Sequence, residues 1–268
     1  MLVGKFIYMA LGLLSQMASF KWPFRRFAKP KVIWLDVAVY AWVLVAELVT
    51  AQLTTPVGEW IGRHAPALSS VLNWLSAHLP WPIALLLFLA AVDFSQYWMH
   101  RLMHSRWIWH HHALHHSVEN MYWLAGLRAS PVHVFLFALP FVFLDLVLPL
   151  PGLAAPVGGI MAMSVQHLIH SNLSWRFGPL EWILVTPRYH LVHHAADPKL
   201  NNSNFGLIFT IWDRMFGTYT APESVGADFP LGLNYPIPFS RLLLGLPPER
   251  GERGERGERG ERGTGART

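Results

Sequence analysis

Long apolar runs alternate with short polar segments along most of this 268-residue chain. An α-helix rises about 1.5 Å per residue and the hydrocarbon core of a bilayer is about 30 Å thick, so a run of about 20 residues can cross it. We predict crossings near residues 32–53, 81–99, 132–150 and 152–170. Asp36 and Glu47 lie within the first run, and we expect them to face the helix bundle in structural polar contacts.

The segments outside these runs predict different structures. Residues 1–20 are apolar and precede a basic patch, so we expect an interfacial or partly inserted helix, with a fifth crossing as the alternative, rather than a cleaved signal peptide. Residues 55–80 contain Pro56, Pro66 and Pro80, which predict broken helix lying on the outer bilayer surface. The final Glu-Arg-Gly repeat has nothing to bury and should be disordered.

These patterns divide the chain into three parts. An apolar and basic N-terminal segment covers residues 1–31, a membrane domain covers residues 32–247, and the repeat tail covers residues 248–268. Both ends of the chain are expected in the cytoplasm, because the predicted number of crossings is even and the basic patch precedes the first one.

Composition supports a membrane protein. Hydrophobic residues make up 53% of the chain and charged residues 14%, and the mean hydropathy is +0.30, which is too apolar for an ordinary soluble domain. We therefore predict an all-α integral membrane bundle of about four transmembrane helices with a cytoplasmic, histidine-rich helical cap. The net charge of +5 is explained by basic residues beside the membrane, so we expect no nucleic-acid partner. The absence of cysteine excludes disulfides and thiolate metal sites.

Histidines gather at the ends of the apolar runs with spacings typical of metal ligands. Imidazole is the commonest metal-binding side chain, and residues three or four apart share a face of a helix. The candidate ligands are His100, His104, His112, His115, His116, His167, His170, His190, His193 and His194. A single zinc uses three or four protein ligands, so this number indicates two metals. All-nitrogen ligation suits zinc, copper, iron or nickel and does not choose among them.

The order of these motifs resembles that of the fatty acid hydroxylase and sterol desaturase superfamily of membrane-bound di-iron oxygenases, in a bacterial-type member. The resemblance covers roughly residues 80 to 220. It rests on HRLMH at 100–104, HALHH at 112–116, HSN at 170–172 and HLVHH at 190–194, with Asp93 and Thr186-Pro187-Arg188 ahead of them. Asp93 lies seven residues before His100 on the same helical face, so it could orient a ligand or bond Tyr97. Asn172 and Asp213 are further candidates for residues that orient the ligands.

The same resemblance implies the chemistry. Two iron ions would use O2 to hydroxylate or desaturate a lipid that arrives through the bilayer, such as a fatty acyl chain or a sterol. No part of the chain resembles a flavin, nicotinamide or haem domain, so electrons would come from a separate donor of the ferredoxin or cytochrome type with its reductase. The implied location is the inner membrane of a bacterium, with the site facing the cytoplasm.

One element departs from the family pattern. Where the family usually has Arg-x-His-Pro, this chain has Arg128-Ala129-Ser130-Pro131. Ser130 cannot replace an imidazole, and the sequence leaves open whether His133 reaches the site. We expect the remaining histidines to be bystanders; these are His64, His78, His110 and His111.

Three other classes remain open at this point. A membrane zinc hydrolase would need a Glu general base beside its ligands, but Arg101 and Leu191 follow the first histidines of their motifs. A bis-histidine haem protein would place its histidine pairs within the bilayer. A non-catalytic, degenerate member of the same family would keep the histidines without turnover. Metal analysis separates the metal-dependent alternatives.

Overall fold

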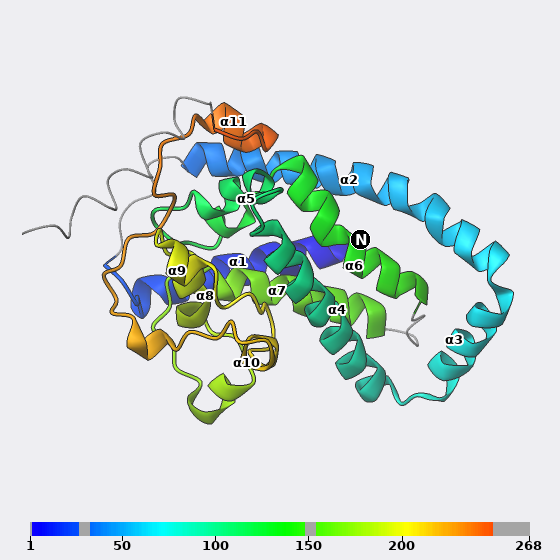
Figure 1. Ribbon diagram of the computed structural model, residues 1–268. Coiled ribbons are helices and arrows are strands. Elements are labelled where there is room, and N and C mark those ends of the chain that lie inside the picture. The colour runs from blue at the N-terminus through cyan, green and yellow to red at the C-terminus, as the bar shows by residue number, and fades with distance from the viewer. Residues whose placement is uncertain (1, 27–32, 148–153, 249–268) are drawn as a thin grey trace, which may run out of the picture.

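The computed structural model describes residues 2–26, 33–147 and 154–248, and these residues form helices and no strand (Figure 1). The all-α prediction is therefore confirmed for this part of the chain. The longer helices are α1 (Leu2–Lys21), α2 (Ile33–His64), α3 (Pro66–His78), α4 (Trp81–Met103), α5 (Trp109–His116), α6 (Pro131–Val147) and α7 (Ala154–Ile169). The shorter ones are η1 (Ala125–Leu127), η2 (Gly178–Trp182), α8 (Pro187–His193), α9 (Pro198–Asn201), α10 (Ile211–Met215), η3 (Pro222–Ser224) and α11 (Phe239–Leu244).

The long helices pack as a bundle that brings the histidine segments to one end. α4 contacts both α6 and α7, α2 runs along α6, and α1 runs along α7. Phe88, Val92 and Leu144 form an apolar contact between α4 and α6. Figure 1 shows α5, α8 and α9 on the side of the bundle to which α4 runs, and α10 packs lower on α4, with Trp212 against Asp93 and Phe94. Histidines that are far apart in the sequence are thereby carried to the same place.

Among the described residues, two helices are long and apolar enough to cross a membrane, at Ile33–Val57 in α2 and Trp81–Met103 in α4. Large apolar side chains stand exposed on both, including Trp34, Leu53 and Leu86. Such faces are unfavourable in water and suit lipid.

The other two predicted crossings correspond to α6 and α7. Their apolar stretches are shorter, at Pro131–Phe141 and Val157–Ile169. Residues 148–153, where the two predicted crossings meet, lie outside the described residues. The number of four crossings stays a prediction.

The predicted helix break at Pro56 is wrong. α2 continues through Pro56 and ends at His64, two residues before Pro66, where α3 begins. Proline inside a helix removes one backbone hydrogen bond. It also disfavours a helical backbone conformation at the residue that precedes it. Ala65 is that residue before Pro66, and it lies outside both helices. Pro66 and Pro80 therefore mark the helix boundaries, and Pro56 does not.

α1 forms as a helix and is fixed to the bundle at its C-terminal end. The Asn172 side chain accepts a hydrogen bond from the Arg25 backbone N–H and donates one to the Arg25 carbonyl, at 2.9 and 2.8 Å. Gly12 allows close packing, because a Cβ there would lie 2.4 Å from the Trp123 ring. Whether α1 crosses the membrane stays untested. The predicted disordered repeat lies outside the described residues from residue 249 onward.

A buried ion pair ties the start of α2 to the loop that precedes α6. The Asp36 carboxylate accepts hydrogen bonds from the Arg128 guanidinium and the Tyr122 hydroxyl. Arg128 also donates to the backbone oxygen and hydroxyl of Ser117, at the end of α5. Asp36 is 1% exposed and Arg128 is 7% exposed. The expected structural contact of Asp36 is therefore confirmed. Arg128, the first residue of the segment that differs from the family pattern, has a structural role as its partner.

We expect Asp36→Asn to destabilise the fold strongly, because it leaves the Arg128 charge buried without its counter-ion. Removing one partner of a buried pair typically costs about 3–5 kcal/mol, equivalent to a fall of about 6–20 °C in Tm for a chain of about this size. The measurement is thermal unfolding of detergent-solubilised protein. Glu59→Gln is the control, since the Glu59–Arg63 pair is exposed and should contribute less than about 1 kcal/mol. Equal Tm values for the two variants would contradict this role.

Candidate metal centre

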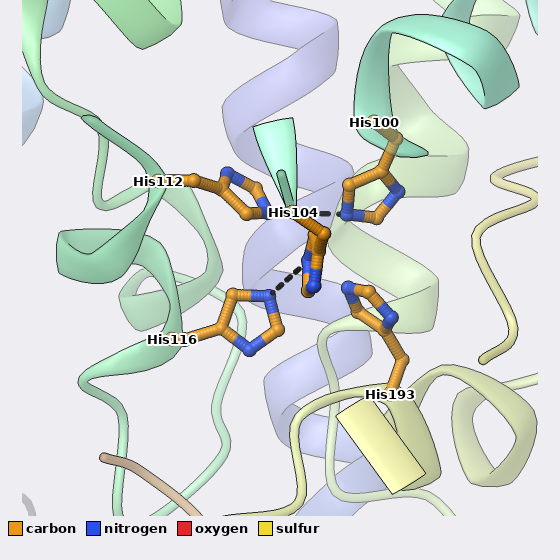
Figure 2. A group of neighbouring side chains, drawn as sticks. All are labelled: His100, His104, His112, His116 and His193. Carbon is orange, nitrogen blue, oxygen red and sulfur yellow. Dashed lines mark hydrogen bonds between the residues drawn. The ribbon is translucent and has the colours of Figure 1, made fainter. Parts of the chain in front are cut away.

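The structure brings nine of the ten predicted ligands together in two adjoining groups, with ligand atoms inside each group within 4.8 Å of one another. Group A, shown in Figure 2, consists of His100, His104, His112, His116 and His193. Group B consists of His115, His170, His190 and His194. The groups touch, because the rings of His116 and His194 stack with centroids 4.6 Å apart.

Each HxxHH motif contributes to both groups. In α5, His112 and His116 join group A while His115 joins group B; in the second motif, His190 and His194 join group B while His193 joins group A. At about 100° per residue, positions i and i+4 differ by about 40° around a helix, whereas position i+3 lies about 60° to the other side. One short helix can therefore serve two metals. The sequence prediction that each motif presents one face did not anticipate this division.

Backbone carbonyls fix the orientation of four rings. The Nδ1 atoms of His100, His115, His170 and His193 lie 2.9, 3.3, 2.7 and 2.8 Å from the carbonyl oxygens of Phe205, Arg128, Gln166 and Ser203, respectively. A carbonyl oxygen can only accept, so Nδ1 carries the proton and donates it. The Nε2 atom of each ring is then left with a free lone pair, which is the form that binds a metal.

These lone pairs converge at a spacing that fits a bound cation. The Nε2 atoms of His115 and His170 are 3.1 Å apart, and neither has a proton to place between them. Further Nε2 pairs lie close together in both groups, at 3.1 Å for His100 and His112 and 2.9 Å for His170 and His190. Nitrogen ligands about 2.1 Å from one ion lie roughly 3.0–3.4 Å from each other in octahedral or tetrahedral geometry. The residues therefore fit a metal in each group.

Burial keeps the imidazoles in the neutral state that a metal requires. Burial, and then repulsion from neighbouring imidazoles, lowers the pKa of His112, His116 and His190 well below the ordinary histidine value of 6.5. Since no protonated ring has to be displaced at neutral pH, metal binding there does not compete with protons.

His167 lies outside both groups. Its ring is buried against Tyr8 and Trp123, with centroids 3.8 and 5.1 Å away. His110 and His111 also lie outside the groups although they are adjacent in sequence to His112. His64 and His78 stack on Trp60 and Trp74 at the far end of the bundle.

Asp93 and Asp213 hold the loop between α9 and α10 rather than contacting a ligand. Asp93 accepts from the backbone N–H groups of residues 207–209 and from the Trp212 indole. Asp213 accepts from the N–H groups of Phe205 and Gly206 and from two hydroxyls. This loop carries the Phe205 carbonyl that orients His100, so the carboxylates act on the centre through the backbone. Asn172, two residues after His170, hydrogen-bonds to the backbone of Arg25 through its side chain, and among the described residues it makes no hydrogen bond to a ligand ring.

Ser130 and His133 resolve the departure from the family pattern. Ser130 precedes α6, donates to the His111 carbonyl at 2.7 Å and accepts from the His133 N–H at 3.3 Å. His133, one turn further along, is buried, and its Nδ1 lies 3.3 Å from Nδ1 of His112. An imidazole therefore does reach group A, from a position three residues later. In the sequence, the only indication that His133 could take this place was its position three residues, about one helical turn, after Ser130.

A cavity of about 280 Å³ borders the centre on the bundle side. Its mainly apolar walls include residues of α2, α4, α6 and α7 and of the loop between α9 and α10. Three group members, His100, His112 and His115, form part of them. Within the described residues, both groups consist of histidines alone, and the nearby Asp93 and Asp213 already accept several hydrogen bonds each. Neither of these two carboxylates is therefore placed to act as the general base of a zinc hydrolase.

Comparisons with known proteins agree on one family. The fatty acid hydroxylase family profile matches residues 85–218, half of the chain. The chain is 36% identical over 171 residues to an alkylglycerol monooxygenase of Xenopus tropicalis, covering 62% of this chain and 36% of that protein. It is 35% identical over 148 residues to an ornithine lipid hydroxylase of Rhizobium tropici (53% and 44%), and 31% identical over 142 residues to a Delta(7)-sterol 5(6)-desaturase of Gibberella zeae (51% and 38%).

These matches span less than half the length of each of these three relatives. No solved structure matches this chain.

We expect His193→Ala to lose metal and His111→Ala to keep it. His193 supplies group A with a buried Nε2 that has no hydrogen-bond partner among the described residues, whereas His111 lies outside both groups. Changes that only touch the surroundings of a ligand already lower affinity about 10–100-fold, so loss of the ligand itself should lower it at least about tenfold. Metal per chain, measured after purification, tests this. Retention in His193→Ala together with loss in His111→Ala would show that the ligands are misassigned.

We expect Gly126→Ala to disturb group B. A Cβ at Gly126 would lie 2.3 Å from Cβ of His170, so His170 would have to move. Gly159→Ala in α7 is the matched control, because a Cβ there meets nothing within 4 Å. Metal titration should show one weakened site of two in Gly126→Ala and two normal sites in Gly159→Ala. Two normal sites in both variants would refute the close packing at His170.

Proposed function

The chain belongs to the fatty acid hydroxylase family, and we propose from this that it is a membrane-bound oxygenase that hydroxylates or desaturates a lipid with O2, two iron ions and external electrons. The observation that carries the proposal is the position of the apolar cavity. It ends at histidines of both groups, His100 and His112 of group A and His115 of group B. A lipid chain lying in this cavity would have its C–H bonds beside the metal pair.

Each iron would be held by one histidine group. Bound iron would supply the activation of O2 and the removal of hydrogen from an unactivated C–H bond. The protein supplies neutral imidazoles whose unprotonated nitrogens are aimed by the carbonyls of Phe205, Arg128, Gln166 and Ser203. Because these carbonyls belong to different segments, they hold the rings in place only in the folded bundle.

The cavity walls would position the lipid and keep water away from it. The apolar residues that line the cavity include Val92 of α4, Phe137 of α6 and Leu207 of the loop between α9 and α10. Apolar walls favour a hydrocarbon chain over water, and exclusion of water protects a reactive centre from side reactions. The relatives named above include a monooxygenase, a hydroxylase and a desaturase, so the proposal covers both outcomes.

We propose that the electrons come from a separate protein of the ferredoxin or cytochrome type. Support comes from a second, more open cavity of about 790 Å³ that reaches His104 of group A. Trp109 lines it and packs against His104 with ring centroids 4.9 Å apart, and its indole N–H donates to the Tyr235 hydroxyl at 2.8 Å. Aromatic side chains thus connect this opening to the metal ligands.

The proposed location is the inner membrane of a bacterium, with the centre facing the cytoplasm. Lys21, Arg25 and Arg26 lie at the histidine end of the bundle, since Arg25 is bonded to Asn172, two residues after His170. Basic residues beside a membrane favour the cytoplasmic side. This arrangement would also bring the centre within reach of cytoplasmic reductants.

The proposal is tested by comparing lipid extracts from cells with and without the protein under ¹⁸O2. We expect a lipid that gains one labelled oxygen or loses two hydrogens. His115→Ala should reduce this product at least about tenfold, because a group B ligand is lost, and His110→Ala should leave it unchanged. Unaltered lipids with a fully metal-loaded protein would overturn the oxygenase function.

A further inference from the structure

Two glutamines interrupt the apolar lining of the cavity, and each stands one helical turn before a histidine of the centre. Gln96 precedes His100 of group A by four residues on α4, and Gln166 precedes His170 of group B by four residues on α7. Residues four apart on a helix are neighbours on one face, about 5–6 Å from each other. The two amides therefore lie at the same depth beside the two halves of the centre.

Gln96 has a fixed orientation and an unused acceptor. Its Nε2 donates to the carbonyl oxygen of Phe137 on α6 at 2.6 Å. Since that carbonyl can only accept, the amide cannot be flipped, and Oε1 is the atom left over. Gln96 is 3% exposed, and Oε1 has no hydrogen-bond partner among the described residues. A buried acceptor without a partner is unfavourable and needs an explanation.

Gln166 also has unused hydrogen-bonding atoms on its side-chain amide. Its backbone carbonyl orients His170, but its side-chain amide makes no hydrogen bond to another described residue and lines the same cavity. Other polar members of the lining are already engaged. Asp93 accepts four hydrogen bonds, and Arg128 is paired with Asp36. The two glutamines thus provide free hydrogen-bonding capacity at the cavity wall.

We propose that Gln96 and Gln166 form a polar subsite that binds a hydrogen-bond donor in the head group of the lipid, either a hydroxyl or an amide N–H. This inference rests on the proposed function and narrows its substrate class. The subsite lies one helical turn from the metal ligands, so a lipid whose head group binds there presents the first carbons of its chain to the centre. The oxidised carbon is therefore close to the head group, and a plain hydrocarbon or a lipid without a donor is a poor ligand.

The test measures binding to the full-length, metal-loaded protein in detergent, separately from turnover. The probes are two matched pairs of single-chain lipids: a glycol head with free hydroxyls against its O-methylated form, and a secondary amide against its N-methylated form. Sites built to hydrogen-bond a substrate group discriminate strongly against analogues that lack it. We expect the wild-type protein to prefer the donor-bearing member of at least one pair by about tenfold or more.

Gln96→Met and Gln166→Met should each reduce that preference at least about threefold, because methionine keeps the length of the side chain and removes its hydrogen-bonding groups. Gln166→Met removes no hydrogen bond between described side chains, so it should fold normally even if Gln96→Met does not. Gln16→Met on α1 is the control, since Gln16 is also a helical glutamine with an unpartnered Oε1 but does not line the cavity. Metal content and Tm report folding for all three variants.

No preference in either pair for the wild-type protein, or an unchanged preference in folded Gln166→Met, would overturn the subsite. A clear preference that disappears in the variants supports it even when no lipid is oxidised. In that case only the oxygenase function fails, because the binding measurement does not depend on turnover.

Discussion

The structure depends on one electrostatic constraint, the gathering of nine buried or half-buried imidazoles whose metal-binding nitrogens face one another. Where Nδ1 of His115 and His170 is committed to a backbone carbonyl, the Nε2 lone pairs meet at 3.1 Å without a proton between them. Such an arrangement repels itself, and a cation at the centre of each group would stabilise it. The carbonyl contacts and the helix ends that supply these rings serve to hold the lone pairs together.

Buried carboxylates stabilise this centre from a distance. Asp93 and Asp213 are almost fully buried, yet their oxygens are satisfied by backbone N–H groups of one loop. Asp36 is satisfied by Arg128 and Tyr122. A buried charge is tolerated only when it is paired or hydrogen-bonded. Each carboxylate therefore fixes a segment that carries an orienting carbonyl, and none of them needs to contact a metal ligand itself.

Much of this protein was determined by the sequence alone, because the relevant signals are local. Apolar runs predicted the helices. Residue spacing along a helix predicted ten ligand histidines, of which nine come together in the structure. The start of α8 is equally local, since the Thr186 hydroxyl accepts from the Tyr189 N–H and Pro187 is the first helical residue. The prediction failed at Pro56, since one missing backbone hydrogen bond does not end a helix within a long apolar run.

Only the tertiary structure decided how these residues are shared. It divided each HxxHH motif between two groups, left His167 against Tyr8 and Trp123, and brought His133 to His112. It also placed two glutamine side chains with unused hydrogen-bonding atoms in the lining of one cavity. Spacing along the chain fixes the face of a helix on which a side chain lies. What that face meets depends on the packing of segments up to about a hundred residues away, such as Phe205 against His100, and no local pattern records it.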